Sequence, residues 1–221
     1  MTGPELDAIL ERGWRRFGPA YFRPACGACQ SCVPLRIPVD SFRMSKSQRR
    51  TWNRVRRRLR VEEGAPRVDD QRLGLYHRWH AEQGARRDWP RDTLDAEEYY
   101  HQFAFPHPCG RELSYWDDAP EDGGEPRLVG VAITDFTPSA LSAVYTYHDP
   151  DYAKWSLGTA SILFQLETAR SSGRRWVYLG YRVEGCPSSE YKGSFQPHQL
   201  LTEGFDLRAR PTWRDELGRW G

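Results

Sequence analysis

The sequence predicts an α+β fold whose core is a mixed β-sheet, preceded by a small basic region that contains three cysteines. Two observations support this prediction. Three apolar runs separated by turns are followed by a helical pattern and a returning apolar run, which is an order typical of a mixed sheet. The first 60 residues differ from the rest in charge and cysteine content. We therefore expect a basic N-terminal region over 1–62 and a second domain over 63–221.

An acidic, glycine-rich turn at 117–126 marks the first part of the sheet. It separates the predicted strands 112–116 and 127–136, which we expect to form a hairpin. The second strand is apolar on both faces and is therefore expected near the centre of the sheet. A third antiparallel strand is predicted over 141–147.

The helix that follows is predicted over 156–170, because apolar residues recur at helical spacing behind a serine cap. It ends at Gly173 and leads into the strand 176–181. Residues 69–105 are also helical in pattern, and we expect their aromatic side chains to be core residues.

The formal net charge of +2 conceals an uneven distribution of charge along the chain. Residues 1–60 hold 14 Lys and Arg against 4 Asp and Glu, whereas the remainder holds 18 against 26. A basic region can hold a polyanion through several phosphate contacts, and an acidic region is poorly suited to that task. The sequence therefore predicts RNA binding by the N-terminal region.

Most of this positive charge lies in a helix predicted over 44–59 and opened by Ser45 or Ser47. Trp52, Val55 and Leu59 form a narrow apolar stripe, so the basic side chains cover the remaining surface. A solvated surface helix is the alternative, but no acidic residue lies between Asp40 and Glu62. The expected RNA contacts are Lys46, Arg49, Arg50, Arg54, Arg57 and Arg58.

Cys26, Cys29 and Cys32 stand at three-residue spacing on a glycine-containing loop. Thiolates at this spacing could converge on zinc or an iron-sulfur cluster, with Cys109, Cys186, a histidine or a small molecule as a further ligand. The alternative is a set of reduced thiols that only pack. An odd cysteine count favours a reducing compartment, and no apolar run reaches 18 residues. We expect a soluble, cytoplasmic protein with no membrane part, and nothing in the sequence indicates its oligomeric state.

The predicted order of strands and helix resembles the core of the GNAT acyltransferases, in which a helix N-terminus faces an anionic donor. Here that end holds the backbone amides of Ser156, Leu157, Gly158 and Thr159, which could bind a phosphate or stabilise an oxyanion. The Gln/Arg-x-x-Gly-x-Gly loop that binds acetyl-coenzyme A in that fold is absent. This absence argues against an acetyltransferase, which stays open as an alternative.

Four motifs occur in a familiar order: the three-cysteine block, Ser45–Arg50, Ser156–Gly158 and Gly180–Lys192. Together they resemble the aminoacyl-tRNA-protein transferases, and most closely the bacterial aspartate/glutamate leucyltransferases, which are related to the eukaryotic arginyltransferases. The resemblance extends from about Phe17 to Phe205.

The resemblance implies transfer of an amino acid from aminoacyl-tRNA to the N-terminal amine of proteins that begin with Asp or Glu, which marks them for degradation. Leucine is the expected donor residue because the basic block is spelled as in the bacterial branch, and arginine is the alternative. The partners would be aminoacyl-tRNA and the acceptor protein. No cofactor is required for transfer.

For the chemistry we expect side chains of the returning strand and of the signature after it: Tyr178, Tyr181, Tyr191 and Lys192. Lys192 or Arg182 would pair with the acidic side chain of the acceptor. Asp149, in an Asp-Pro-Asp loop, could accept the proton of the acceptor amine, although a turn role is equally open. Strand alternation predicts that Tyr178 and Tyr181 lie on opposite faces.

Two features depart from the family pattern. Ser188–Ser189 stand where members usually have a Lys-Met or similar pair, and members usually begin with a longer segment. These departures keep a further alternative open, a tRNA-binding or redox-sensing module without catalysis.

Overall fold

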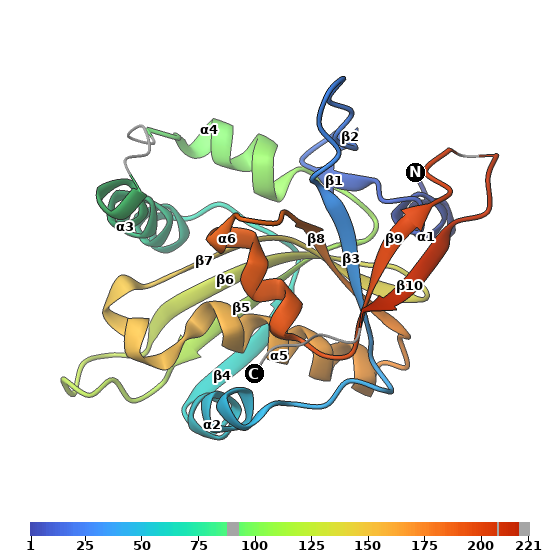
Figure 1. Ribbon diagram of the computed structural model, residues 1–221. Coiled ribbons are helices and arrows are strands. Elements are labelled where there is room, and N and C mark those ends of the chain that lie inside the picture. The colour runs from blue at the N-terminus through green and yellow to red at the C-terminus, as the bar shows by residue number, and fades with distance from the viewer. Residues whose placement is uncertain (88–92, 207, 217–221) are drawn as a thin grey trace.

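A single large β-sheet organises the molecule (Figure 1). The computed structural model describes residues 1–87, 93–206 and 208–216. Within them the sheet has the order β10–β9–β3–β8–β7–β6–β5–β4. All neighbours are antiparallel except β7 and β8, so the sheet is mixed, as predicted. The strands are β3 (Val33–Pro38), β4 (Leu59–Gly64), β5 (Gly110–Asp117), β6 (Arg127–Phe136), β7 (Ala140–His148), β8 (Trp176–Arg182), β9 (His198–Glu203) and β10 (Thr212–Glu216).

Helices cover both faces of this sheet. In Figure 1, α2 (Lys46–Val55) and α5 (Leu157–Ser171) lie on one side, and α3 (Asp70–Arg87) and α4 (Ala96–Tyr99) lie on the other. The remaining elements are short: α1 (Gly3–Leu10), β1 (Arg15–Phe17), β2 (Ala20–Phe22), η1 (Tyr100–Ala104), η2 (Pro150–Trp155), α6 (Pro187–Glu190) and η3 (Tyr191–Ser194). No helix in the described ranges is both long enough and apolar enough to cross a membrane.

The connection from β7 to β8 follows the prediction from the sequence. The chain leaves β7, passes through η2 and α5, and returns as a strand parallel to β7. The two strands pair only from Ala140 opposite Trp176 to Ser142 opposite Tyr178. Because β7 continues to His148 and β8 to Arg182 without further pairing, their carboxyl halves separate and leave room between them.

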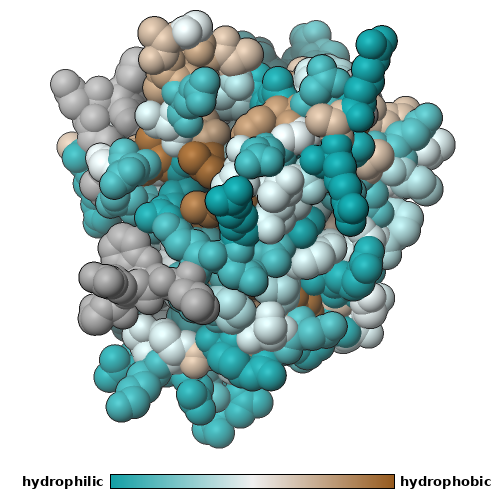
Figure 2. All heavy atoms as spheres, turned by 45° about the vertical axis from the view of Figure 1, so that its right-hand side comes forward, coloured by the Kyte–Doolittle hydropathy of each residue, from teal (hydrophilic) through white to brown (hydrophobic). Residues whose placement is uncertain are grey.

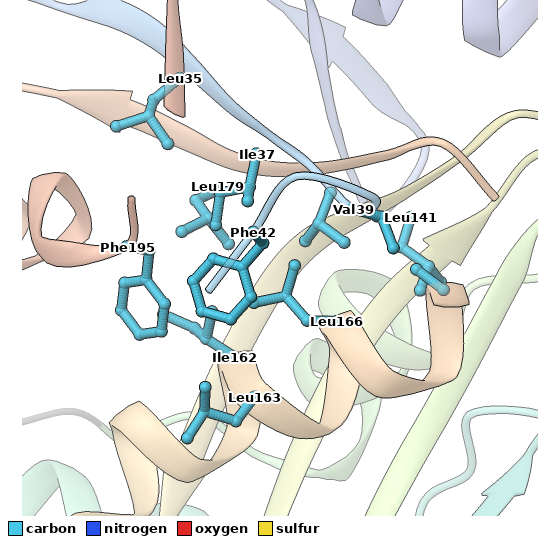
Figure 3. Packing of buried hydrophobic residues seen from close by; sticks show 12 residues of the cluster. Leu35, Ile37, Val39, Phe42, Leu141, Ile162, Leu163, Leu166, Leu179 and Phe195 are labelled. Atoms are coloured by element: carbon cyan, nitrogen blue, oxygen red, sulfur yellow. The ribbon is translucent and has the colours of Figure 1, made fainter. Parts of the chain in front are cut away.

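The largest apolar cluster lies between α5 and the centre of the sheet (Figure 3). Ile162 and Leu166 of α5 pack against Leu35 of β3 and Val177 of β8, all of them buried. The N-terminal region therefore supplies a central strand to the core. The boundary that we expected after residue 62 does not coincide with a break in this sheet, since β3 lies between β8 and β9.

The basic helix is shorter than expected. Ser45 caps α2 by accepting a hydrogen bond from the backbone of Gln48, as predicted, but the helix ends at Val55 and not at Leu59. Leu59 instead begins β4 and pairs with Asp117 of β5. The pairing of β4 along the edge of the sheet thus overrides helical propensity in the last turn of the arginine run.

Candidate active site

A pocket of about 410 Å³ opens where β7 and β8 separate. Its walls come from five elements that are distant in sequence: α3, β7, α5, β8 and the segment formed by α6 and η3. The described residues that line it are Trp79, Gln83, Ala143, Val144, Tyr145, Thr146, His148, Gly158, Ile162, Gln165, Leu179, Ser188, Tyr191 and Lys192. Apolar and aromatic groups predominate, and Lys192 is the one charged group in this set.

Helix α5 forms the floor of the pocket through Gly158, Ile162 and Gln165, whose spacing places them on one face. Ser156 precedes the helix in the left-handed conformation, with φ of 53°. A side chain added at Gly158 would meet no atom within 4 Å, so the first turn of the helix is open at this point. The first turn of the helix, at the positive end of its dipole, therefore borders the pocket.

Gln165 is a polar residue in this largely apolar floor. Its side chain is buried, and its amide nitrogen donates to Ser161 at 3.2 Å. Ser161 is held in turn by the hydroxyl of Tyr115 at 3.0 Å. The amide oxygen of Gln165 has no hydrogen-bond partner among the described residues. A buried acceptor without a donor is costly, so this oxygen favours a ligand that brings an N–H group.

Lys192 supplies the positive charge of the pocket. Its ammonium group donates to the backbone oxygen of Tyr181 at 3.1 Å, and no carboxylate pairs with it in the described residues. Burial, reinforced by the nearby Arg15, lowers the pKa of Lys192 to about 8. The side chain is thus mostly protonated at neutral pH and able to bind a carboxylate.

His148 stands at the carboxyl end of β7 in the same pocket. Burial lowers the pKa of its imidazole, so the ring is neutral at neutral pH. The Nδ1 atom lies 3.4 Å from the backbone oxygen of Asp149. When Nδ1 carries the proton and donates to that oxygen, Nε2 is left as an acceptor that can take up a proton.

The predicted catalytic residues divide into two groups. Tyr191 and Lys192 line the pocket together with Gly158 of the predicted donor-binding turn. Tyr178 does not: it is buried next to α1, and its hydroxyl lies 3.5 Å from Arg36. Tyr181 donates its hydroxyl hydrogen to the backbone of Gly13 and is absent from the pocket lining.

The expectation that Tyr178 and Tyr181 lie on opposite faces is wrong. Both rings contact the guanidinium of Arg15, at 5.2 and 5.5 Å. The reason is a β-bulge: two residues of β8 stand opposite Leu35 of β3, and Gly180 has a φ of 82°. The extra residue reverses the alternation beyond it.

Asp149 and Arg182 are also unsuited to the roles predicted for them. Asp149 is buried, accepts two hydrogen bonds from Arg78 at 2.8 and 3.0 Å, and does not line the pocket. Its carboxylate also accepts from the backbone amide of Asp151 and so caps the η2 turn, which is the turn role left open from the sequence. Arg182 forms an ion pair with Glu216 of β10 and lies outside the pocket lining.

The expected tRNA contacts differ in how free their side chains are. Lys46, Arg49, Arg50 and Arg57 are exposed. Arg54 is exposed too, but it donates to the backbone oxygen of Lys154.

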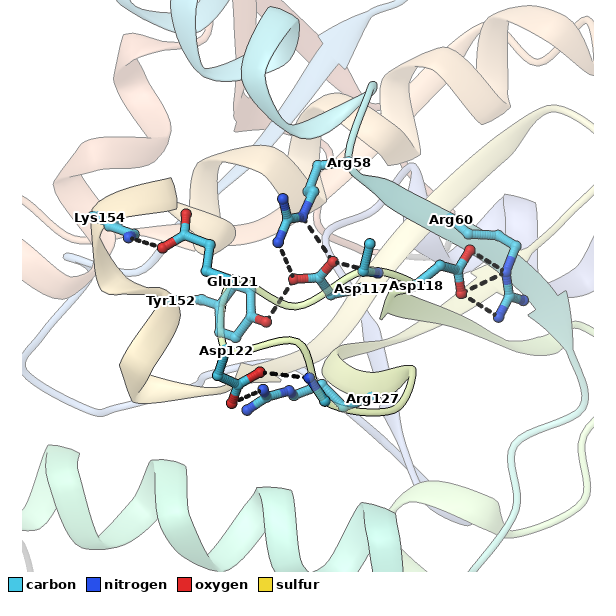
Figure 4. A network of polar contacts seen from close by, with 11 residues as sticks. Arg58, Arg60, Asp117, Asp118, Glu121, Asp122, Arg127, Tyr152 and Lys154 are labelled. Carbon is cyan, nitrogen blue, oxygen red and sulfur yellow. Dashed lines mark hydrogen bonds and ion pairs between the residues drawn. The ribbon is translucent and has the colours of Figure 1, made fainter.

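Arg58 is occupied (Figure 4), because it pairs with Asp117, which also accepts from the Tyr152 hydroxyl at 2.7 Å. The acidic turn predicted from the sequence thus neutralises part of the basic run, and Arg58 is removed from the set of RNA contacts.

Cys26, Cys29 and Cys32 lie on a loop before β3 and line a second pocket of about 580 Å³. Cys26 and Cys29 are exposed, and Cys29 lies 3.4 Å from the hydroxyl of Ser31. In the described part of the chain no three His, Cys, Asp or Glu side chains gather as a metal site. Binding of zinc or an iron-sulfur cluster by these thiols stays a prediction from the sequence.

Gln165 and His148 were missed from the sequence. Gln165 could have been found by extending the face of Gly158 and Ile162 along the helix, because residues 158, 162 and 165 share one side. His148 had no such signal, because its importance depends on where β7 and β8 stop pairing.

Family models match two segments of the chain. A model described as the C terminus of arginine-tRNA-protein transferase matches residues 71–202, which contain the whole pocket lining. A model described as the N terminus of the same protein matches residues 2–50.

Curated relatives match over most of their length. Aspartate/glutamate leucyltransferase of Stenotrophomonas maltophilia is 38% identical over 216 residues, covering 94% of this chain and 80% of the relative. The same-named protein of Halorhodospira halophila is 35% identical, covering 95% and 85%. The one from Campylobacter jejuni is 32% identical, covering 88% and 79%.

Solved structures support the fold. FemX matches with a TM-score of 0.55 at 12% identity, covering 86% of this chain and 64% of that chain. L-PGS from Bacillus licheniformis matches with a TM-score of 0.51 at 12% identity, and the match covers 85% of this chain and 53% of that chain. Both neighbours share the GNAT-like arrangement of sheet and helix found here. The chain belongs to the arginine-tRNA-protein transferase family, and it is an aminoacyltransferase that acts between aminoacyl-tRNA and protein N-termini.

Proposed function

We propose that the protein transfers leucine from leucyl-tRNA to the N-terminal amine of proteins that begin with Asp or Glu. The observation that carries this proposal is the pocket between β7 and β8, where the N-terminus of α5 and Lys192 meet apolar walls. The names of the curated relatives support the same reaction.

The pocket walls favour leucine as the transferred residue. Val144, Ile162 and Leu179 offer an apolar surface, and no Asp or Glu is found among the described lining residues. A guanidinium group buried here would lack a partner, whereas a leucine side chain gains free energy from burial. The unpartnered amide oxygen of Gln165 can accept a hydrogen bond from the α-ammonium of the donor residue.

Lys192 provides the selectivity for acidic acceptors. Its ammonium group is held by Tyr181 and has no carboxylate partner in the described residues, so a carboxylate of the acceptor would complete the pair. Tyr191 forms the adjacent wall with 44% of its surface exposed. Ser188 also lines the pocket, which places one of the two family departures beside this contact.

The reaction is aminolysis of an ester and balances without an oxidant or reductant. The neutral acceptor amine attacks the ester carbonyl, a C–N bond forms, and the bond from the carbonyl carbon to the ribose oxygen breaks. Nε2 of His148 takes the proton that the amine loses and passes the same proton to the leaving ribose oxygen, so the imidazole ends neutral. The amides after Ser156 stabilise the negative charge on the carbonyl oxygen.

We propose that the transfer step needs no cofactor, because an ester is already activated toward an amine. Zinc or an iron-sulfur cluster at Cys26, Cys29 and Cys32 stays a separate prediction, tested by metal analysis of protein purified without oxygen. We also propose a cytoplasmic location, where aminoacyl-tRNA and new acceptor N-termini are both available.

The test is transfer of radiolabelled leucine or arginine from the charged tRNA to peptides that differ only in their first residue, Asp, Glu, Arg or Ala. Label from leucyl-tRNA on the Asp and Glu peptides alone is the expected result. Label from arginyl-tRNA would instead support the alternative suggested by the description of the family models. Absence of label from both donors, with intact tRNA binding, would refute the proposed function.

A further inference from the structure

A basic pocket lies at the other end of the sheet, next to α1 and β10. Its volume is about 540 Å³, and its described lining comprises Arg12, Arg36, Arg208 and Arg210, one acid, Glu11, and three other residues. We call it the arginine pocket. It lies on the side of the molecule that Figure 2 turns toward the viewer, a face covered mostly by hydrophilic side chains.

Arg36 lies at the base of the arginine pocket and is only 8% exposed. Its guanidinium is sandwiched between the rings of Trp176 and Trp213, 3.7 and 4.2 Å from their centroids. It donates to Gln199 at 2.8 Å, and no carboxylate pairs with it in the described chain. The aromatic faces stabilise the cation in part. A nearly buried charge without an acid still has a free-energy cost that a bound anion would lower.

Residues 208–211, in the loop before β10, form one wall of the arginine pocket. Gly204 has a φ of 83°, and a side chain there would lie 2.3 Å from the backbone oxygen of Arg210, so the two ends of the loop touch. Arg12 donates to Ala209 in this loop and to Ala8 of α1. The loop thus holds the exposed Arg208 and Arg210 above Arg36 before any ligand arrives.

The arginines of this pocket differ from those at the opposite edge of the sheet. Arg58 and Arg60 are neutralised by Asp117 and Asp118, whereas no ion pair is recorded for Arg12, Arg36, Arg208 or Arg210 within the described residues. We propose that the arginine pocket binds phosphate groups, and specifically phosphates of an RNA backbone.

Planar guanidinium groups match phosphate oxygens in pairs, and three or four of them around one acid favour a multiply charged anion over a single carboxylate. The RNA half of this proposal rests on the proposed function, since tRNA is the nucleic acid that the reaction uses. The phosphate half does not, because it follows from the pocket alone.

The first experiment measures binding of inorganic pyrophosphate by calorimetry to the wild-type chain and to the double variant Arg208→Gln/Arg210→Gln. Both side chains are exposed, and neither forms an ion pair or side-chain hydrogen bond within the part of the chain that the structure describes, so the fold should be unaffected. We expect at least about tenfold weaker binding in the variant. The matched control is Arg214→Gln, in the adjoining strand β10, 66% exposed and paired with Glu203 outside the pocket, which should bind as wild type.

The second experiment measures binding of uncharged tRNA at several salt concentrations, which needs no transfer activity. Loss of two phosphate contacts should reduce the slope of log affinity against log salt by about 2 relative to Arg214→Gln. Weaker pyrophosphate binding with an unchanged tRNA slope would retain the phosphate site and refute its RNA occupant. Unchanged binding of both pyrophosphate and tRNA in the double variant would refute the whole proposal. So would displacement of bound tRNA by an acidic peptide but not by pyrophosphate.

A further variant, Arg36→Lys, keeps the charge and removes the planar group between the two tryptophans. We expect it to weaken pyrophosphate binding while circular dichroism and melting show a folded chain. Wild-type affinity in this folded variant would contradict the role given to Arg36. A defect in amino-acid transfer with both binding readouts intact would count against the proposed function and leave this inference standing.

Discussion

Arg36, in the arginine pocket, and the arginines near β4 and β5 are stabilised by different kinds of neighbour. Near β4 and β5 the guanidinium groups meet carboxylates, as Arg72 does with Glu112 at 2.9 Å and Arg60 does with Asp118 at 2.8 Å. Near β9 and β10, Arg36 meets two indole rings and an amide. The difference teaches that a count of basic residues does not measure the charge available to a ligand, because pairing within the chain removes part of it.

The largest expected effect comes from breaking the buried pair. Arg72→Met leaves Glu112 with 2% of its side chain exposed and without its cation. We expect a loss of about 3–5 kcal/mol in the free energy of unfolding, because an uncompensated buried charge is costly. Urea denaturation measures it. A loss below 1 kcal/mol would show that carboxylate pairing is not what holds this edge.

The comparison between paired and unpaired cations extends to Lys192 in the active-site pocket, which has no carboxylate partner among the described residues. Lys192→Met should lower kcat/KM for peptides beginning with Asp by about 10- to 100-fold, the value of a charge-assisted hydrogen bond. A peptide beginning with Ala should be much less affected. Lys154→Met is the matched control, since Lys154 is 62% exposed and paired with Glu121. Equal losses for both peptides would exclude a role in acceptor selectivity.

The pH dependence of this selectivity follows from the pKa of Lys192, which burial lowers to about 8. The ammonium form carries the charge, so it is present below pH 8 and lost above it. The ratio of kcat/KM for the Asp peptide to that for the Ala peptide should therefore be constant below about pH 7 and fall as pH rises through 8. Titration of the α-amine cancels in this ratio. A ratio that falls only near pH 10 would contradict the prediction.

The arginine run can be divided by the same criterion. Arg49→Ala/Arg50→Ala should weaken tRNA binding several-fold and reduce the salt slope by about 2, because both side chains are exposed and free of carboxylates. Arg58→Ala should leave the slope unchanged, because Arg58 already pairs with Asp117. Filter binding over a salt series distinguishes them. A reduced slope for Arg58→Ala would show that the pair opens for RNA.

The smallest effect on stability is expected for Arg60 and Asp118, the more exposed of the arginine–carboxylate pairs near β4 and β5. Arg60 and Asp118 are each nearly half exposed, so Arg60→Ala should change the free energy of unfolding far less than Arg72→Met does. Addition of salt should reduce even that difference. A loss as large as that of Arg72→Met would mean that exposure does not separate the two pairs.

The part of the fold that could be predicted from the sequence is the part built by local signals. The turn at 117–126 and the helix that begins after Ser156 both depend on neighbouring residues. The capping role expected of the Ser156 side chain is wrong, because this residue stands at the N-cap in the left-handed conformation and its hydroxyl makes no capping hydrogen bond. The insertion of β3 between β8 and β9 could not be predicted, because such pairing depends on contacts across more than 140 residues, as between Arg36 and Tyr178. The pattern of apolar residues within one strand does not show which distant strands it pairs with.

The site could be predicted in the same measure. Gly158, Tyr191 and Lys192, which line the pocket, could be identified because they belong to short motifs of neighbouring residues. Arg58 was misjudged because its partner, Asp117, is 59 residues away. His148 was missed because a lone histidine at a strand end has no pattern.

The bulge at Gly180 has a consequence for engineering the family. Beyond it, every side chain of β8 points to the side opposite to the one that simple alternation gives. Deleting one residue there would exchange the surroundings of Tyr181 and Arg182 and withdraw the carbonyl that holds Lys192. The bulge therefore fixes the position of the carbonyl that accepts from Lys192, and through it the position of the charged group of the pocket.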